Sequence, residues 1–158
     1  MTRFSLSIKV TLTALLGVFL LGWGTARAQV TVSLPTVTAQ VGTTPDLPIM
    51  VSDLTGLDVQ SYEFIVAYDP TFIRISGVDV SGTLSDVAGA KPPQVNLTTP
   101  GQIRVSYASP TVLTGAGTLL KLKASFDSRG TSPLTFNSFM FNEGTPAVVT
   151  TNGSAVVP

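Results

Sequence analysis

Residues 59–80 read VQSYEFIVAYDPTFIRISGVDV, and they hold the clearest structural pattern in the chain. In the first half, two sets of side chains alternate: Tyr62, Phe64, Val66 and Tyr68 against Ser61, Glu63, Ile65 and Ala67. This period of two, in a run rich in aromatic and β-branched residues, is typical of a half-buried strand whose aromatic set faces a core. Asp69-Pro70 interrupts the strand, because proline has no N–H to donate to a ladder. Since a second β-branched run follows at 72–80, we predict two strands joined by a tight corner.

The N-terminal segment has the three parts of a secretory signal peptide. Arg3 and Lys9 make a basic start, residues 10–23 are an apolar run, and Ala26-Arg27-Ala28 has small residues at the spacing of a cleavage site. The apolar run is shorter than the ~20 residues that a membrane span needs. We therefore predict that residues 1–28 are removed on export. Residues 29–158 then form one domain without a membrane span, either secreted or retained in the periplasm.

Composition excludes several classes of function. The chain has no Cys and no His, so it lacks disulfides, the commonest general base and the commonest metal ligand. Beyond residue 28 acidic residues outnumber basic ones, and no cluster of Lys or Arg indicates nucleic-acid binding. We expect no nucleic-acid partner, no metal and no cofactor.

The other segments are short extended runs separated by turn residues, with no helical period. Pro35 interrupts residues 30–40, which indicates a strand that breaks or changes sheet there. Pro48, within the run 47–51, favours an edge strand for the same reason. About nine such strands predict an all-β fold, an antiparallel β-sandwich.

The C-terminal half contains two further signals. Asp127-Ser128-Arg129-Gly130 reads as a hairpin turn, with glycine where a positive φ costs little. The aromatic run 134–141 follows, and its alternation slips near Ser138, which indicates a β-bulge.

This order of landmarks resembles the cohesin domain, the receptor module that holds dockerin-tagged enzymes in cellulose-degrading complexes. The match rests on VTVSLPTVTAQVGTTPDLPIMVSDL (30–54), the Tyr68-Asp69-Pro70 corner with its two strands, GQIRVSYAS (101–109), GTLLKLKASF (117–126), and a phenylalanine-rich strand before TNGSAVVP (151–158). It covers essentially all of residues 29–158. The resemblance implies a jelly-roll sandwich, related in fold to carbohydrate-binding modules, that recognises a dockerin-bearing protein and has no catalytic activity.

The resemblance also implies a binding surface. In cohesins the dockerin docks on one sheet, and polar side chains on the strand before the corner are central to the contact; by position these are Ser61 and Glu63. If the strand 102–108 lies beside this strand, as the family's sheet order implies, Arg104 could pair with Glu63. The predicted partner-binding residues are the outward side chains of the two strands: Ser61, Glu63, Ile65, Ala67, Gln102, Arg104 and Ser106.

The same residues also allow an ordinary surface. An exposed Glu63–Arg104 cross-strand pair contributes only about 0.2–1 kcal/mol, and single exposed apolar residues such as Ile65 are common. The chain also departs from well-studied dockerin binders: Ser61 and Glu63 stand where Asn and Asp are usual. The segment after Ala108, Ser109-Pro110-Thr111, is short and uncharged where many members carry an acidic loop.

The sequence favours two other classes of function less. Direct binding of a polysaccharide usually needs exposed aromatic rings, and residues 29–158 contain no Trp; Phe139 or Phe141 would serve only if the bulge turned them outward. An enzyme is disfavoured, because a glycosidase needs two carboxylates in a cleft and most acidic residues here lie in turns. Asp79 and Asp86 are too few and too far apart in sequence to specify a calcium site.

Overall fold

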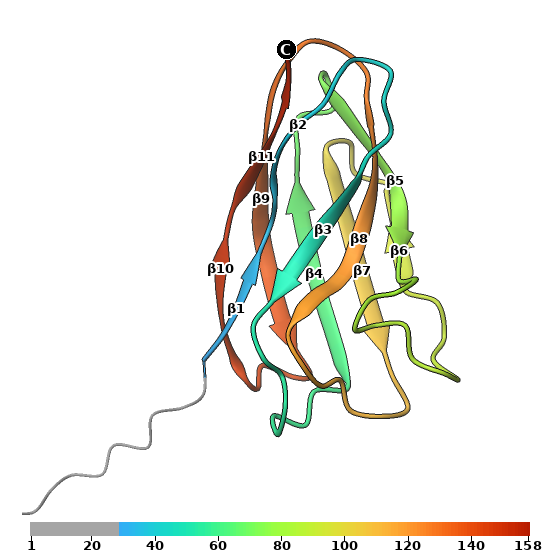
Figure 1. The fold of residues 1–158 in the computed structure, drawn as a ribbon, viewed down its shortest axis with the longest axis vertical. Coiled ribbons are helices and arrows are strands. Elements are labelled where there is room, and N and C mark those ends of the chain that lie inside the picture. Colours follow the sequence, from blue (N-terminus) through green and yellow to red (C-terminus); the bar gives the residue numbers. More distant parts are fainter. Residues whose placement is uncertain (1–28) are drawn as a thin grey trace, which may run out of the picture.

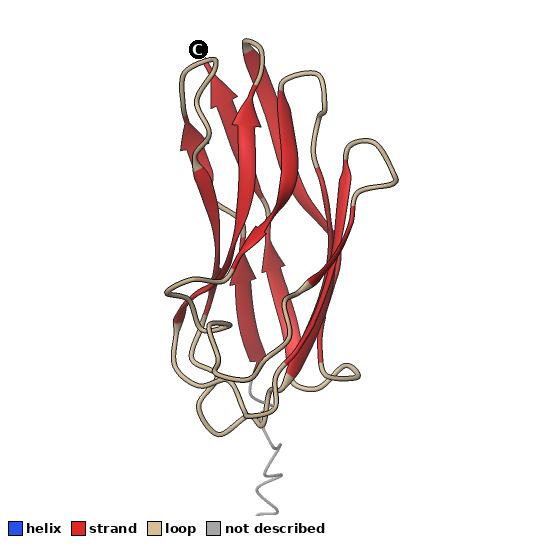
Figure 2. Cartoon of the chain, turned by 90° about the vertical axis from the view of Figure 1, so that its right-hand side faces the viewer, coloured by secondary structure: helices blue, strands red, loops and turns tan. Residues whose placement is uncertain are grey.

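The computed structural model describes residues 29–158, which form two packed β-sheets (Figure 1). Every regular element among them is a strand (Figure 2), so none of these residues belongs to a helix of membrane-spanning length and hydropathy. The predicted signal peptide lies outside the described residues and stays a prediction.

The first sheet has five strands and the second has six. The five-stranded order is β10 (Ala147–Thr151), β1 (Gln29–Ser33), β3 (Asp46–Val51), β8 (Gly117–Phe126) and β5 (Ile73–Asp79). The six-stranded order is β2 (Thr36–Thr38), β11 (Gly153–Val157), β9 (Gly130–Phe141), β4 (Ser61–Ala67), β7 (Gln102–Ala108) and β6 (Gln94–Asn96).

The all-β sandwich predicted from the sequence is confirmed, with two adjustments. The structure has eleven strands instead of about nine, because the run 30–40 divides at Pro35 into β1 and β2, and because β10 lacks an alternating pattern in the sequence. The pairs β1–β10 and β2–β11 are parallel, whereas all other pairs are antiparallel. A sequence pattern reports which residues are buried but not which way a neighbouring strand runs.

The corner at Asp69-Pro70 carries the chain from the six-stranded sheet into the five-stranded one, because β4 and β5 belong to different sheets. The Asp69 carboxylate accepts a hydrogen bond from the backbone N–H of Thr71 at 2.9 Å, and its own N–H donates to Ser132 Oγ at 2.8 Å. The predicted pair of strands and its corner are confirmed. The break at Pro35 is confirmed too, since β1 and β2 lie in different sheets.

Two local predictions were wrong. The turn predicted at residues 127–130 does not close a hairpin, because β8 belongs to the five-stranded sheet and β9 to the six-stranded one. Hairpins and crossings between sheets reverse the chain with the same turn residues, so local chemistry cannot separate them. Strand β3 is not at an edge, because it lies between β1 and β8. Proline is tolerated there because β1 pairs only with Met50 and Val51, beyond Pro48.

The two inner faces meet in one apolar core. Tyr62, Phe64 and Val66 of β4 are almost fully buried, as their alternation predicts. The bulge predicted near Ser138 is confirmed: Ser138 lies opposite Ile65, but Phe136 lies opposite Val66, so one residue of β9 is extra. Because of this extra residue both Phe136 and Phe139 pack on Phe64, with ring centroids 6.2 and 5.7 Å away.

A long connection, residues 80–93, joins β5 to β6 and is tied to the core through Ser85. The Ser85 hydroxyl lies 2.8 Å from the phenol oxygen of Tyr62. The backbone carbonyl of Ser85 accepts a 2.8 Å hydrogen bond from the phenol of Tyr107. Burial raises the pKa of the Tyr62 phenol, so the group stays neutral. These bonds hold the connection against the inner side of the six-stranded sheet.

Candidate functional site

The two strands that carry the predicted site lie side by side. β4 and β7 pair antiparallel, with Glu63 opposite Ser106 and Ile65 opposite Arg104. Since the alternate side chains of both strands are buried in the core, all seven predicted residues point to the outer face of the six-stranded sheet. Glu63, Arg104 and Ser106 are exposed, and the other four are half-buried: Ser61, Ile65, Ala67 and Gln102.

One detail of the predicted site was wrong. Glu63 and Arg104 do not form an ion pair, because the register places Arg104 opposite Ile65 and only diagonally from Glu63. Within residues 29–158, the ion pairs of the structure involve other residues, on the opposite sheet and its turns. The relative register of two strands cannot be derived from the alternation within each.

The flanking strands β9 and β6 extend the outer face of β4 and β7. We call the whole of this surface, the flanking strands included, the β4–β7 face. Met140 of β9 lies opposite Glu63, and Ser138 lies opposite Ile65. On the other side, Gln94 and Asn96 of β6 lie opposite Ser106 and Arg104. These four residues were not predicted from the sequence. Met140 was within reach of it, because a bulge near Ser138 reverses the phase of β9 and turns position 140 outward.

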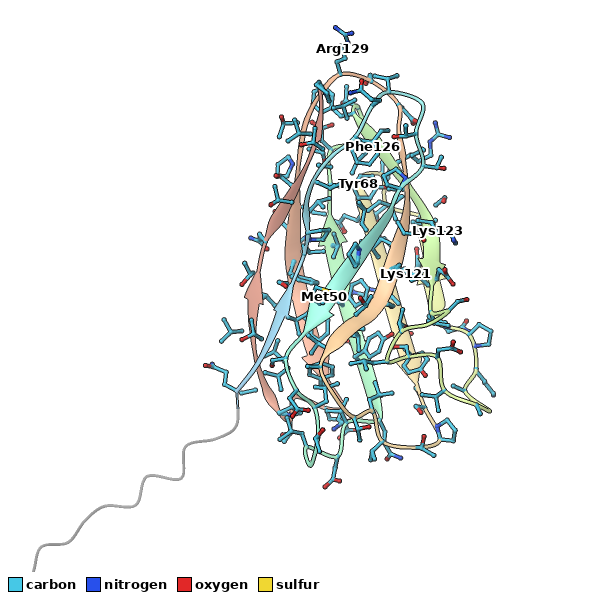
Figure 3. The ribbon with its side chains drawn as sticks, in the orientation of Figure 1. Met50, Tyr68, Lys121, Lys123, Phe126 and Arg129 are labelled. Atoms are coloured by element: carbon cyan, nitrogen blue, oxygen red, sulfur yellow. The ribbon has the colours of Figure 1, made fainter. Side chains whose placement is uncertain are left out.

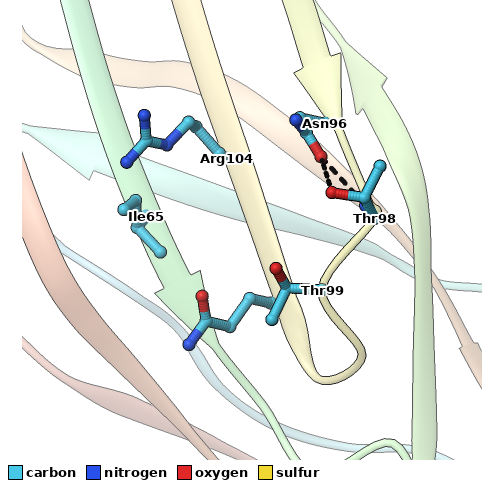
Figure 4. Close-up of a pocket in the computed structure, with 6 residues that line it drawn as sticks. Ile65, Asn96, Thr98, Thr99 and Arg104 are labelled. Atoms are coloured by element: carbon cyan, nitrogen blue, oxygen red, sulfur yellow. Dashed lines mark hydrogen bonds between the residues drawn. The ribbon is translucent and has the colours of Figure 1, made fainter.

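Shallow hollows follow one another along the β4–β7 face. One, of about 220 Å³, is lined by Ile65, Asn96, Thr98, Thr99, Gln102 and Arg104 (Figure 4). A second, of about 420 Å³, includes Glu63, Ser106, Met140 and Glu143 in its lining. Both are open to solvent, which suits contact with another macromolecule better than enclosure of a small substrate.

Asn142 positions the end of the face where β4 begins. Its side-chain oxygen accepts hydrogen bonds from the backbone N–H groups of Gln60 at 3.0 Å and Ser61 at 3.2 Å. Its side-chain nitrogen donates to the carbonyls of Asp58 at 3.3 Å and Thr145 at 2.9 Å. One side chain thus joins the segment before β4 to the turn after β9.

The outer face of the five-stranded sheet has a different character. Asp79 lies 3.5 Å from Lys121 Nζ and 3.8 Å from Lys123 Nζ, and both lysines lie on β8 (Figure 3). Hydrogen bonds from the backbone and side chain of Ser81, with help from the two lysines, lower the pKa of Asp79 to about 2. Charges there are paired within the chain.

Asp79 and Asp86 do not come together around a cation site. Asp86 accepts a hydrogen bond from the backbone N–H of Gly82 at 2.9 Å, whereas Asp79 faces the lysines. Residues 29–158 contain no group of three or more acidic side chains that could hold a metal ion.

The aromatic rings are directed inward or covered at their edges. Among residues 29–158 the rings are buried or half-buried. The half-buried ones are those of Tyr68, Phe72, Phe136 and Phe139. Phe141 is fully buried, and Phe139 stacks on Phe64 with its ring plane within 1° of parallel. The bulge therefore turns both phenylalanines into the core and leaves no flat ring platform on the β4–β7 face.

Comparison of the sequence with models of known families agrees with the β-sandwich fold described above. The family model for the cohesin domain matches residues 30–157. The chain belongs to the cohesin family. A search of curated proteins finds no match.

Solved cohesin structures share the fold. The sixth cohesin of scaffoldin B from Acetivibrio cellulolyticus, solved in complex with a Cel5 dockerin mutant, is 17% identical, with a TM-score of 0.70 over 83% of this cohesin and 100% of that chain. A non-cellulosomal cohesin from the archaeon Archaeoglobus fulgidus is 21% identical, with a TM-score of 0.68 over 83% and 92% of the two chains. A cohesin from Clostridium acetobutylicum is 20% identical, with a TM-score of 0.68 and the same coverage.

Proposed function

We propose that this cohesin is a non-catalytic recognition module that binds a dockerin-type protein through the β4–β7 face. The observation that carries the proposal is the composition of that face. Ile65, Ala67 and Met140 supply apolar contact, and polar groups on β4 and β7, such as Glu63 and Gln102, supply hydrogen bonds. Specific interfaces combine an apolar centre with a few polar groups that fix the register.

Membership of the cohesin family supports the same function. The Acetivibrio cellulolyticus neighbour was solved in complex with a dockerin. The Archaeoglobus fulgidus neighbour is described as non-cellulosomal, so a cohesin fold does not by itself imply a cellulosome. We propose extracellular polysaccharide breakdown or cell-surface assembly as the setting, with residues 1–28 acting as the export signal.

The absence of an enclosed cleft on the β4–β7 face supports a function without catalysis. Glu63 and Glu143 are exposed and line an open hollow. A glycosidase holds its two carboxylates about 5–10 Å apart, on either side of the scissile bond of a bound sugar in a cleft. The face offers no such enclosure.

Binding to purified dockerins tests the proposal. Dockerins encoded in the same genome are titrated into the cohesin by isothermal calorimetry. We expect saturable binding to at least one, a loss of binding in Ile65→Lys, and retained binding in Met50→Lys. Met50 is the matched control, because it is exposed on the outer face of the other sheet.

Two results would contradict the proposal. Failure of every dockerin to bind at high concentration would remove the function. Binding to cellulose or to a glycan array, without binding to any dockerin, would favour the alternative of a carbohydrate-binding module.

A further inference from the structure

Arg104 is an unpaired cation in the middle of the β4–β7 face. It is exposed, and none of residues 29–158 forms an ion pair with it. Its two cross-strand neighbours, Ile65 and Asn96, are uncharged. Arg74, Lys121 and Lys123, by contrast, all pair with carboxylates elsewhere on the molecule.

The hollow beside Arg104 is lined by groups that can donate hydrogen bonds. The Asn96 side-chain oxygen is already occupied, since it accepts from the backbone N–H of Thr98 at 2.9 Å and from its hydroxyl at 2.7 Å (Figure 4). The side-chain nitrogen of Asn96 is left to face a partner. Gln102 and Thr99 also line the hollow, and their side chains make no hydrogen bond to other described residues.

No carboxylate lines this hollow. In Figure 4 the Arg104 side chain extends from β7 toward β4 and lies beside Ile65. The hollow therefore combines a guanidinium and amide donors with one aliphatic wall. This combination complements a short acidic side chain, whose oxygens accept from the donors while its methylene groups contact Ile65.

The neighbouring hollow carries the opposite charge. Glu63 and Glu143 line it, and both are exposed. Along β4 and β7 the face thus changes from positive at Arg104 to negative at Glu63. Complementary charges at an interface fix the orientation of a partner, because like charges in contact are strongly unfavourable.

From these observations we infer that the Arg104 hollow receives an Asp or Glu side chain of the docking partner, and that this contact sets the partner's orientation on the face. The inference rests on the proposed dockerin-type function. It adds the chemistry that the partner must present: a carboxylate over the hollow beside Arg104, on the side away from Glu63.

The test starts from a dockerin that binds the cohesin. Arg104→Gln should weaken binding about tenfold or more, and Arg104→Lys should weaken it less, because lysine keeps the charge but not the two-pronged geometry. Arg129→Gln is the matched control. It removes the same charge from an exposed turn between β8 and β9, at one tip of the molecule (Figure 3) and outside the lining of both hollows. The dissociation constant should therefore stay unchanged.

A double-mutant cycle identifies the carboxylate. Each Asp or Glu of that dockerin outside its calcium loops is changed to Asn or Gln. One such change should weaken binding to the wild-type cohesin about tenfold and leave binding to Arg104→Gln unaffected. The loss should be smaller at high salt, because salt screens the charges.

Three other results of these binding measurements would contradict the inference. Equal affinity of the wild type and Arg104→Gln would overturn the inference and leave the proposed function standing. Weaker binding by Arg104→Gln without any coupled dockerin carboxylate would also overturn it. If no dockerin binds the wild-type cohesin, the proposed function fails and the inference fails with it.

Discussion

The side-chain oxygen of Asn142 lies 3.0 Å from the backbone nitrogen of Gln60, although 82 positions separate the two residues. The bond joins the turn after β9 to the start of β4, where the β4–β7 face begins. Asn142 has a φ of 44°, in the left-handed region that asparagine tolerates better than most residues. Its backbone conformation and its side-chain bonds therefore support the same junction.

Replacement of Asn142 should destabilise the domain. Asn142→Ala loses the side-chain hydrogen bonds and places alanine at a positive φ, so we expect a loss of about 2 kcal/mol in the free energy of unfolding. Asn142→Gly loses the bonds but tolerates the φ, and should lose about 1 kcal/mol less. Urea unfolding measures both. Asn137→Ala, at an exposed position in the bulge, is the control and should change stability by less than about 0.5 kcal/mol. Equal losses for Asn142→Ala and Asn137→Ala would show that the junction contributes nothing.

Met140 and Met50 form a matched pair on opposite sides of the sandwich. Met140 is 38% exposed on the β4–β7 face, and Met50 is 41% exposed on the outer face of the five-stranded sheet. Met140→Ala should weaken dockerin binding about tenfold, since truncation of a side chain that contributes strongly to an interface costs more than about 1 kcal/mol. Met50→Ala should have no effect on binding. Calorimetric titration of both variants checks this, and equal affinities would place the contact elsewhere.

Two glycines should respond in opposite ways to the same substitution. A Cβ at Gly153 would collide with the backbone carbonyl of Pro35, which accepts the 3.1 Å hydrogen bond from Ser154 that links β11 to the β1–β2 break. Because backbone cannot move aside cheaply, Gly153→Ala should cost about 2–3 kcal/mol of stability. A Cβ at Gly77 has no atom within 4 Å, so Gly77→Ala should be neutral within about 0.5 kcal/mol. Urea midpoints measure the difference, and a neutral Gly153→Ala would mean that the β2–β11 pairing is looser than the structure has it.

Asp79 should make stability depend on acid pH. Its pKa in the folded protein is about 2, below the ordinary value of 3.8, so the ionised carboxylate stabilises the fold. That contribution is fully present above about pH 4 and is lost as the pH falls toward about 2. Melting temperatures of the wild type and Asp79→Asn, measured across this range, should differ above it and converge at its lower end. A constant difference at every pH would contradict this account of Asp79.

The alternation in residues 59–80 carried most of what could be predicted about the six-stranded sheet. It identified the buried face of β4, and the same pattern identified the buried face of β7. Period-two burial is a local property, because successive side chains of any strand point to opposite sides. The corner at Asp69-Pro70 and the break at Pro35 were predictable for a similar reason, since proline removes a ladder donor wherever it occurs.

Properties that depend on partners distant in sequence came only from the tertiary structure. Sequence could not show that Met140 stands opposite Glu63, that Arg104 stands opposite Ile65 and is unpaired, or that the turn at residues 127–129 crosses between sheets. Strand order, direction and register are decided by how both sheets fill a common core, and many registers satisfy the same local alternation. The sequence by itself therefore determined which side chains of β4 and β7 face outward. Only the packing of the two sheets decided which of them lie together as one surface.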